Sequence, residues 1–358
     1  MKKVAIIGTN GIPSKYGGFE TLVEYLVKYL SSEYELTVFC SSITNPNKIA
    51  EYNGCKLEYI PLRANGWQSI FYDIVSVFKS SRNYDKILIL GASGSIIMPL
   101  VSRYRKKYIF NFGGLDWDRS KWNYFTRKFL KLSESLGIKY ADYLISDNIG
   151  IQEYIQSEYN RDSTLITYGG DQAFGVTPEK KDFEKYPFLK DSYAFSVARI
   201  QPDNNIDLLL ESFDEKSPIP FVLVGNWKSC KYGIETKLKY EGRPNVILLD
   251  AIYDSRELNL LRSNCKIYLH GHSAGGTNPA LVEAMNLGLP IFAYNCIFNR
   301  YTTSNAAEYF SSSDELSIKV QTVSDPVLSD IGSKMYSIAK ELYQWETIAN
   351  KYSEVIDK

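Results

Sequence analysis

Short apolar runs alternate with segments of helical periodicity along almost the whole chain. In the first half, the runs lie at 4–7, 36–39, 87–90, 108–112, 143–145 and 163–166. After the first run, Leu22, Leu26 and Leu30 recur at the spacing of one helix face. Short runs that are apolar throughout are typical of strands buried on both faces. The first half therefore predicts a parallel sheet covered by helices on both sides.

The same pattern restarts after a polar stretch at 168–187, which contains glycine and proline and is predicted to be a linker. Strands are predicted at 194–198, 221–224, 246–249, 267–269 and 290–293, with helices at 206–213, 255–262 and 279–287. One last helix is predicted at about 334–355. The chain therefore predicts an α/β protein with two doubly wound, Rossmann-like domains, 1–172 and 173–333. The helical segment 334–358 is expected to pack back on the first domain.

Composition supports two ordinary hydrophobic cores and excludes several classes of protein. The chain has 358 residues, of which 44% are apolar and 23% charged. The 41 Lys and Arg residues balance 41 Asp and Glu residues, which argues against a nucleic-acid partner. Five scattered cysteines without a Cys-x-x-Cys pair predict neither a zinc site nor a disulfide framework. No apolar run approaches the length of a signal peptide or a membrane span, so we expect a cytoplasmic protein.

Charge is distributed unevenly despite the zero total. Residues 1–170 carry 21 basic and 16 acidic side chains, and residues 171–358 carry 20 and 25. Within 121–132, Trp122, Phe125, Phe129 and Leu132 recur at helical spacing among basic residues. Such a helix is typical of a membrane interface, and the alternative is a core-packed helix with solvated lysines. The residues expected to meet a membrane or an acceptor are Arg103, Arg105, Lys106, Lys107, Trp117, Lys121, Trp122, Arg127 and Lys128.

Two loops of the first domain are candidates for ligand binding, because ligands of parallel sheets sit at the carboxyl ends of strands. The loop 8–20 ends in Gly17 and Gly18 before a helix, an arrangement suited to a phosphate. The alternative is a plain tight turn. Asp116 and Asp118 flank Trp117 after another predicted strand and suit sugar hydroxyls. Asp116 is alternatively the N-cap of the next helix.

Two loops of the second domain carry the strongest signals. Arg199 follows a predicted strand and is a candidate clamp for a diphosphate, or alternatively part of a surface ion pair. In 269–285, a small polar stretch precedes a helix that begins near Pro279. The backbone N–H groups near Thr277, Asn278 and Ala280 are expected to face an anion, and Glu283 to accept hydrogen bonds from ribose. The spacing of His270 and His272 does not suit zinc, so they bind a substrate or are structural.

The segment 275–290, Gly-Gly-Thr-Asn-Pro-Ala-Leu-Val-Glu-Ala-Met-Asn-Leu-Gly-Leu-Pro, resembles the donor-binding segment of glycosyltransferase family 4. Val-Ala-Arg at 197–199 is similar to the arginine-bearing strand end of that family. Motifs at 13–21, 114–117, 146–148, 168–171 and 294–303 resemble its bacterial rhamnosyltransferase branch, which acts in capsule and cell-wall polysaccharide synthesis.

The resemblance implies a GT-B fold, with two domains facing a cleft, a nucleotide-diphospho-sugar donor in the second domain, retention at the anomeric carbon and no metal or other cofactor. It implies that Arg199 neutralises the diphosphate and that Glu283 holds the ribose. The backbone at Thr277, Asn278 and Leu281 would meet phosphate, and Gly17 and Gly18 would approach it from the first domain.

The chain departs from the family pattern at several positions. Gly275 stands where the family has its first glutamate, and Asn204 where it has a lysine. Asn204 is still expected to be one of the donor-binding residues. The histidine common in the first domain is absent from 111–116. Asp116 is therefore the candidate to orient or deprotonate the acceptor hydroxyl, and His272 is expected to replace part of the lost donor contacts.

These features lead to the expectation of a β-1,4-L-rhamnosyltransferase that uses dTDP-L-rhamnose. Its expected acceptor is a polyprenyl-diphosphate-linked GlcNAc or Glc, met at the inner face of the cell membrane by a peripheral enzyme. One alternative is transfer of another hexose, such as glucose or galactose. A second is an NAD(P)-dependent nucleotide-sugar oxidoreductase with Tyr124 and Lys128 as its catalytic pair. A third is a sugar-nucleotide-binding scaffold without activity, which Gly275 and Asn204 favour.

Overall fold

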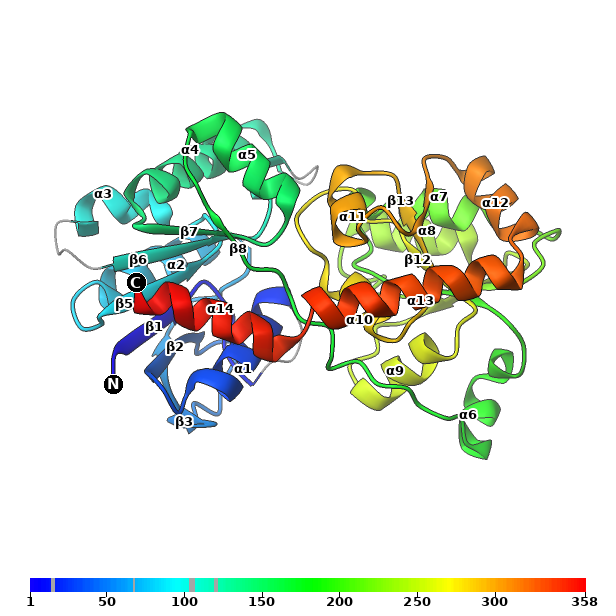
Figure 1. The fold of residues 1–358 in the computed structure, drawn as a ribbon, viewed down its shortest axis with the longest axis horizontal. Helices are drawn as coiled ribbons and strands as arrows, with labels where there is room; N and C mark the ends of the chain where they lie inside the picture. The colour runs from blue at the N-terminus through cyan, green and yellow to red at the C-terminus, as the bar shows by residue number, and fades with distance from the viewer. Residues whose placement is uncertain (14–16, 67, 103–106, 119–121) are drawn as a thin grey trace. The chain divides into compact units, whose positions relative to one another are not determined.

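The computed structural model describes residues 1–358 except 14–16, 67, 103–106 and 119–121. The chain divides into two compact units. Unit 1 comprises Met1–Tyr168 and Trp345–Lys358, and unit 2 comprises Gly169–Gln344. The chain therefore crosses between the units twice, once after Tyr168 and once before Trp345 (Figure 1).

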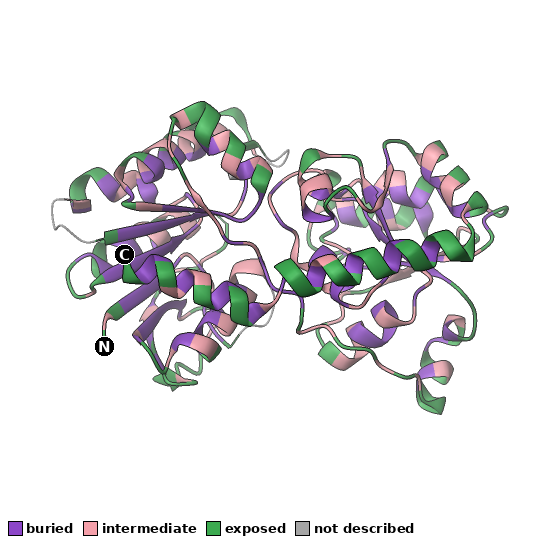
Figure 2. Ribbon diagram, viewed as in Figure 1, coloured by how far each residue is buried: buried purple, intermediate pink, exposed green. Residues whose placement is uncertain are grey.

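Unit 1 is built on an eight-stranded sheet. Its strands are β1 (Lys3–Ile7), β2 (Glu35–Ser41), β3 (Glu51–Tyr52), β4 (Cys55–Ile60), β5 (Lys86–Leu90), β6 (Lys107–Phe112), β7 (Tyr143–Ser146) and β8 (Thr164–Leu165). Their order is β3-β4-β2-β1-β5-β6-β7-β8. β3 pairs antiparallel with β4, and the other pairings among the described strands are parallel. The central strands are buried along almost their whole length, which agrees with their apolar sequences (Figure 2).

Helices cover this sheet. They are α1 (Gly18–Leu30), α2 (Gln68–Ser80), α3 (Met98–Val101), α4 (Tyr124–Tyr140), α5 (Ile149–Tyr159) and α14 (Trp345–Asp357), with short 3-10 turns η1 (Ser95–Ile97) and η3 (Asp116–Asp118). Local sequence sets several of their ends. The side chain of Asn148 caps α5 by accepting from the backbone N–H of Gly150 at 2.9 Å, and Asn160 ends it in the left-handed conformation.

The pattern of apolar runs does not predict the β3–β4 hairpin or α2. Asn53 and Gly54 form the hairpin turn with φ values of 47° and 77°, the conformation that Asn-Gly favours. In α2, Phe71 and Phe78 point to solvent, so its apolar residues do not follow a single buried face.

Unit 2 is built on a six-stranded parallel sheet. Its strands are β9 (Ala194–Val197), β10 (Phe221–Val224), β11 (Val246–Leu249), β12 (Ile267–His270), β13 (Ile291–Tyr294) and β14 (Glu308–Phe310), in the order β11-β10-β9-β12-β13-β14. β9 lies between β10 and β12, so the order of strands reverses at the β9–β12 pair. Ligands of doubly wound sheets bind at such a reversal, outside the carboxyl ends of the strands.

The helices of unit 2 connect these strands. They are α6 (Lys180–Lys185), α7 (Ile206–Glu211), α8 (Lys231–Tyr240), α9 (Ser255–Ser263), α10 (Pro279–Asn286), α11 (Ile297–Thr302), α12 (Ser313–Thr322) and α13 (Asp325–Leu342), with 3-10 turns η4 (Pro187–Lys190) and η5 (Pro202–Asn204). The repeated strand–helix alternation confirms the prediction of a second doubly wound unit.

The C-terminal segment consists of two helices, and the prediction of one helix at 334–355 is wrong. α13 belongs to unit 2, whereas α14 belongs to unit 1. The break falls at Tyr343, with φ −122° and ψ 45°. The Tyr343 hydroxyl donates to the carbonyl of Thr302 at 2.6 Å and stays in unit 2. Trp345, two residues on, stacks on Tyr25 of α1 with ring centroids 4.6 Å apart.

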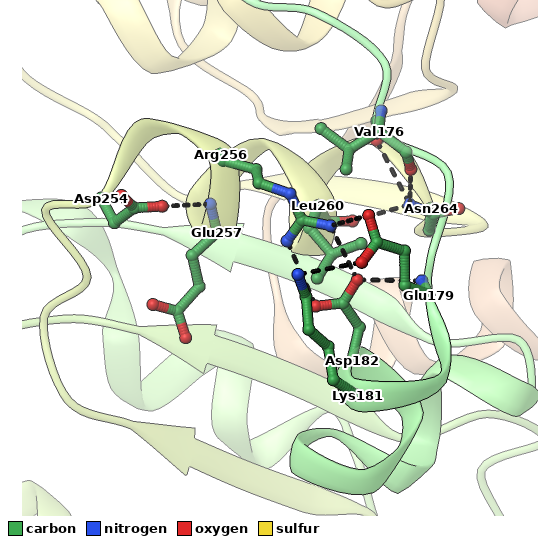
Figure 3. Close-up of polar contacts among 10 residues, drawn as sticks. Val176, Glu179, Lys181, Asp182, Asp254, Arg256, Glu257, Leu260 and Asn264 are labelled. Carbon is green, nitrogen blue, oxygen red and sulfur yellow. Dashed lines mark hydrogen bonds and ion pairs between the residues drawn. The ribbon is translucent and has the colours of Figure 1, made fainter.

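The segment that follows Tyr168 and leads to η4, called the connector below, is fixed to unit 2 by an ion pair. Arg256 of α9 donates to both carboxylate oxygens of Asp182 in α6, at 3.2 and 2.9 Å (Figure 3). This guanidinium and the backbone N–H of Glu179 lower the pKa of Asp182 to about 2. The segment predicted to be a linker therefore includes a helix that is fixed to the unit it leads into.

Candidate functional site

The loops after β9 and β12 meet at the strand-order reversal of unit 2. β12 pairs with β9 in parallel, so the carboxyl ends of both strands lie at one edge of the sheet. Asn205, after η5, donates from its side chain to the carbonyl of Gly271 at 2.8 Å. The N–H of Ser273 donates to the carbonyl of Asp203 at 3.0 Å. The predicted arginine loop and the predicted histidine loop are thus joined.

Asn204 and His272 form a hydrogen-bonded pair within this joined loop. The Nδ2 of Asn204 donates to the carbonyl of Arg199 at 2.6 Å, which sets the orientation of the amide. Its Oδ1 then accepts from Nδ1 of His272 at 2.5 Å. The imidazole therefore carries a proton on Nδ1. Asn204 is buried and orients His272, whereas Arg199 is exposed after β9.

The backbone conformation at Gly275 disfavours an acidic residue, or any residue with a β-carbon, at this position. Its φ is +107°, a conformation that strains residues with a β-carbon. A β-carbon built at Gly275 would also lie 3.3 Å from Nε2 of His272. At Gly275, where the family that the chain resembles has its first glutamate, a turn therefore brings the backbone close to the histidine.

The N-terminus of α10 differs from the prediction of free backbone N–H groups. The side chain of Asn278 is the N-cap and accepts from the N–H of Ala280 at 2.9 Å, and Pro279 has no N–H. The N–H of Leu281 donates to the carbonyl of Asn278 at 3.1 Å. The Ala280 and Leu281 donors therefore have acceptors already. Thr277 is buried just before the helix.

Glu283 lies one turn into α10 and is held on both carboxylate oxygens. Its Oε2 pairs with Nη2 of Arg262 at 2.6 Å, and its Oε1 accepts from the side-chain amide of Gln172 at 2.7 Å. Its side chain is 18% exposed, whereas that of Arg262 is only 3% exposed. Neither Arg262 nor Gln172 belongs to a motif that the sequence alone marks as a site. The one sequence feature that could have drawn attention to Arg262 is its place directly after the apolar pair Leu260 and Leu261 in α9.

His270 is buried at the end of β12 beneath the loop. Burial and then the neighbouring His272 hold the pKa of His270 well below its ordinary value, so it is neutral. Its Nε2 has no hydrogen-bond partner among the residues that the structure describes. The ring centroids of His270 and His272 are 5.9 Å apart. Of the two histidines, His272 is the one placed in the loop.

In unit 1, Asp116 and Trp117 lie in η3 after β6. The alternative that Asp116 caps the next helix is wrong, because Asn123 caps α4 by accepting from the N–H of Thr126 at 2.9 Å. Nζ of Lys131 lies 4.6 Å from the ring centre of Trp117. The η3 turn is therefore tied to α4 through this cation–π contact.

Gly17 and Gly18 lie where α1 begins, and Gly17 has φ 126°. Oε1 of Glu20 in the first turn accepts from the backbone N–H of Asn10 at 2.8 Å, so a carboxylate of unit 1 already meets this loop. The approach of the two glycines to a donor phosphate stays a prediction.

The predicted basic, aromatic surface is only partly described. Arg103, Arg105, Lys106 and Lys121 fall outside the described residues. Lys107 begins β6 and donates to the carbonyl of Lys358 at 3.0 Å. It therefore lies at the amino end of its strand, away from the carboxyl edge. Trp122 and Arg127 are half-buried, and Lys128 is exposed on α4.

The exposed face of α4 contradicts the core-packed alternative, and binding of this helix to a membrane stays a prediction. Its buried residues are Leu130, Ser133, Glu134, Gly137 and Ile138. Phe125 is 79% exposed and Leu132 is 52% exposed, so the predicted aromatic stripe does not pack into the core. Tyr124 is also exposed, and Nζ of Lys128 lies 4.5 Å from its ring centre. The structure leaves an aromatic and basic face of α4 in solvent.

Neither a metal cluster nor a membrane-spanning helix is found in the described part of the chain. Within it, no three His, Cys, Asp or Glu side chains gather in a way that suits a metal ion. The described helices are all too short or too polar to cross a membrane. Independence of metal stays a prediction.

Two family models match the chain, one in each unit. Residues 1–171 match a family described as "Domain of unknown function (DUF1972)". Residues 178–314 match the family described as "Glycosyl transferases group 1", and this segment contains Arg199, His272 and Glu283. A comparison with curated proteins finds no match to this chain.

Solved structures share the fold over the whole chain. The sucrose-phosphate synthase of Thermosynechococcus elongatus is 16% identical with a TM-score of 0.81, covering 99% of this chain and 98% of its own. Anabaena HepE in complex with UDP and glucose is 16% identical with a TM-score of 0.78, covering 100% of both chains. An Escherichia coli structure described as trehalose-6-phosphate bound with UDP-2-fluoro glucose is 12% identical, with a TM-score of 0.69 and coverage of 100% and 99%.

The similarity to these solved structures and the two doubly wound sheets show that the chain has the GT-B fold. The glycosyltransferase group 1 domain in unit 2 then makes the chain a transferase enzyme, a GT-B glycosyltransferase. The oxidoreductase alternative is therefore wrong. Its proposed pair, Tyr124 and Lys128, lies on the exposed face of α4.

Proposed function

We propose that this glycosyltransferase moves a sugar from a nucleotide-diphospho-sugar to a lipid-linked acceptor with retention of configuration and without a metal ion. The specific reaction proposed is β-1,4 transfer of L-rhamnose from dTDP-L-rhamnose to polyprenyl-diphosphate-linked GlcNAc or Glc in polysaccharide biosynthesis. The observation that carries the donor part is the joining of the loops that hold Arg199 and His272 at one edge of the unit 2 sheet, just before the helix that carries Glu283.

The class of donor is supported by chemistry at this edge. A diphosphate needs cationic and hydrogen-bonding partners, and Arg199 and His272 lie in loops that are bonded to each other. Glu283 offers a fixed carboxylate to ribose hydroxyls. HepE of Anabaena, which shares the fold, is described in complex with UDP and with glucose. The choice of dTDP and rhamnose rests on the resemblance of the sequence motifs.

The proposed mechanism follows from where charge develops. Breaking the bond between the anomeric carbon and the diphosphate places negative charge on the leaving group and positive charge on the sugar ring. Arg199 stabilises the leaving group, and this stabilisation grows as the charge develops. The acceptor hydroxyl attacks from the face that the diphosphate leaves, and a departing phosphate oxygen takes its proton. In the proposal, Asp116 orients this hydroxyl, or takes its proton in place of the phosphate oxygen.

The proposed lipid-linked acceptor requires contact with a membrane surface. The exposed face of α4 supports this, because Tyr124, Phe125 and Leu132 present apolar area beside the cation of Lys128. Aromatic side chains insert at the level of lipid headgroups, and each nearby cation adds about 1 kcal/mol on an anionic leaflet. We therefore propose peripheral binding at the inner face of the cell membrane.

A product assay tests the proposal. Purified protein is incubated with dTDP-L-rhamnose, UDP-glucose or UDP-galactose and with polyprenyl-diphosphate-GlcNAc or -Glc, and the lipid products are analysed by mass. The expected product gains one deoxyhexose, and NMR of the released disaccharide shows a β-linkage to the 4-position. If the lipid product instead gains a hexose from a UDP-sugar, the enzyme transfers glucose or galactose and not rhamnose. Binding of nucleotide sugars without transfer to either acceptor would contradict the proposed acceptor class and favour the scaffold alternative.

A further inference from the structure

The carboxylate of Glu283 is fixed by two side chains from different parts of unit 2. Arg262 comes from α9 and pairs with Oε2 at 2.6 Å. Gln172 comes from the connector, three residues after the chain enters unit 2, and donates to Oε1 at 2.7 Å. A carboxylate held on both oxygens has no free rotation, so its remaining lone pairs point in set directions.

Burial of Arg262 at this contact removes water from its charged guanidinium, which is unfavourable by itself. Only 3% of its side chain is exposed, and a buried guanidinium needs a partner of opposite charge. Glu283 supplies that partner, and Asn259 accepts from Nη1 at 3.3 Å. In contrast, Arg256 on the same helix is 38% exposed and pairs with Asp182 in the connector. The two arginines of α9 therefore serve different partners.

Gln172 is held by the packing of the connector against α10. A β-carbon at Gly170 would lie 2.3 Å from the carbonyl oxygen of Val282, so the connector backbone contacts the helix directly. The N–H of Gly170 donates to the carbonyl of Tyr343 at 2.9 Å. These contacts place the amide of Gln172 beside Glu283.

We propose that Arg262 and Gln172 are positioning residues for nucleotide recognition: they hold the Glu283 carboxylate so that it accepts hydrogen bonds from the pentose hydroxyls of the nucleotide, which are the 3′-hydroxyl alone in dTDP and the 2′- and 3′-hydroxyls in UDP. This inference rests on the proposed function. Each oxygen of an ionised carboxylate accepts about two hydrogen bonds, so one position on each oxygen is left for a hydroxyl. Arg262 and Gln172 do not themselves touch the nucleotide in this proposal.

Binding measurements on nucleotides with and without ribose hydroxyls test the inference. The full-length protein is titrated calorimetrically with UDP and dTDP, and with their 2′,3′-dideoxy analogues. We expect Arg262→Met and Gln172→Ala each to weaken binding of the preferred hydroxyl-bearing nucleotide about tenfold and to leave binding of its dideoxy analogue unchanged. Arg262→Lys is expected to restore part of the loss. In the Glu283→Ala background, Arg262→Met is expected to cause no further loss.

The control variant is Arg256→Met, which removes an arginine from the same helix and should leave both affinities as in the wild type. Equal weakening of the hydroxyl-bearing and dideoxy nucleotides by Arg262→Met and by Gln172→Ala would overturn the inference, because it indicates a general structural effect. If Arg262→Met does not fold, as judged by circular dichroism, Gln172→Ala alone decides. Failure of the wild type to bind either nucleotide would instead contradict the proposed function.

Discussion

Arg199 is the residue whose charge the proposed mechanism needs most. It follows β9, is exposed, and provides the carbonyl that orients Asn204. Asn204 in turn orients His272, so the backbone of the arginine loop sets the position of the imidazole.

Replacement of this arginine tests its role. We expect Arg199→Ala to lower kcat at least about tenfold, equivalent to ~1.4 kcal/mol of transition-state stabilisation, because the developing charge on the diphosphate loses its partner. Turnover is measured with the donor identified by the product assay. Arg243→Ala is the control, because Arg243 lies against Tyr240 at the end of α8. An unchanged kcat for Arg199→Ala would remove this residue from the mechanism.

The ion pair of Asp182 is expected to make the stability of the fold depend on pH. Its pKa is lowered to about 2 in the folded chain by Arg256 and by a backbone N–H, from an ordinary value of 3.8. A lowered pKa contributes stability that is present above the ordinary value and is lost as the pH falls toward 2. We expect Asp182→Asn to be less stable than the wild type at pH 7, and the difference to shrink between pH 4 and pH 2.

Urea unfolding at a series of pH values measures this difference. Asp191→Asn is a suitable control, because Asp191 is exposed after η4. A gap between wild type and Asp182→Asn that stays constant from pH 7 to pH 2 would show that the ion pair with Arg256 does not stabilise the connector.

Among the helices, α4 has the exposed surface that is expected to bind a membrane. Its core contacts come from the Leu130 side, whereas Phe125 and Lys128 face solvent. We expect Phe125→Ser and Lys128→Glu each to weaken binding to vesicles at least about fivefold, equivalent to ~1 kcal/mol, through lost apolar burial or lost attraction to anionic lipid. Cosedimentation with phosphatidylglycerol–phosphatidylcholine vesicles measures this.

The matched control for this surface is Leu238→Ser, since Leu238 is 73% exposed on α8 of unit 2. Its affinity for vesicles should equal that of the wild type. Loss of binding in Leu238→Ser to the same degree, or binding by the wild type that does not respond to salt or lipid charge, would contradict docking through α4.

Elements differ in how far the sequence predicts them. The buried parallel strands, such as β1 and β10, follow from their apolar runs because burial on both faces leaves no alternation. The break between α13 and α14 does not follow, because the residues around Tyr343 continue a helical spacing of apolar positions. The break arises because Tyr343 is bonded within unit 2 while Trp345 is packed in unit 1.

At the scale of the whole molecule, α14 completes unit 1 with residues that follow unit 2 in the chain. Trp345, Ile348 and Tyr352 are almost fully buried there. We expect Trp345→Ala to lower the free energy of unfolding of unit 1 by about 3–5 kcal/mol, because a large cavity opens beside Tyr25. Hydrogen exchange followed by mass spectrometry separates the units, since peptides of 1–168 report on unit 1.

Trp227→Ala provides the matched control, because Trp227 is equally buried in unit 2. It should increase exchange in peptides of 169–344 and leave those of unit 1 less affected. Faster exchange confined to unit 2 in Trp345→Ala would contradict the assignment of α14 to unit 1.

The strand–helix alternation, the two doubly wound units and the candidate segment 275–290 are predictable from the sequence, because periodicity and turn chemistry are local properties of the chain. The sequence also singles out Glu283 and His272. The partners of these two residues become visible in the folded chain, because Asn204 lies 68 positions from His272 and Gln172 lies 111 positions from Glu283. Such pairs depend on strand order, which brings the carboxyl ends of β9 and β12 to one edge, and no local pattern encodes that order.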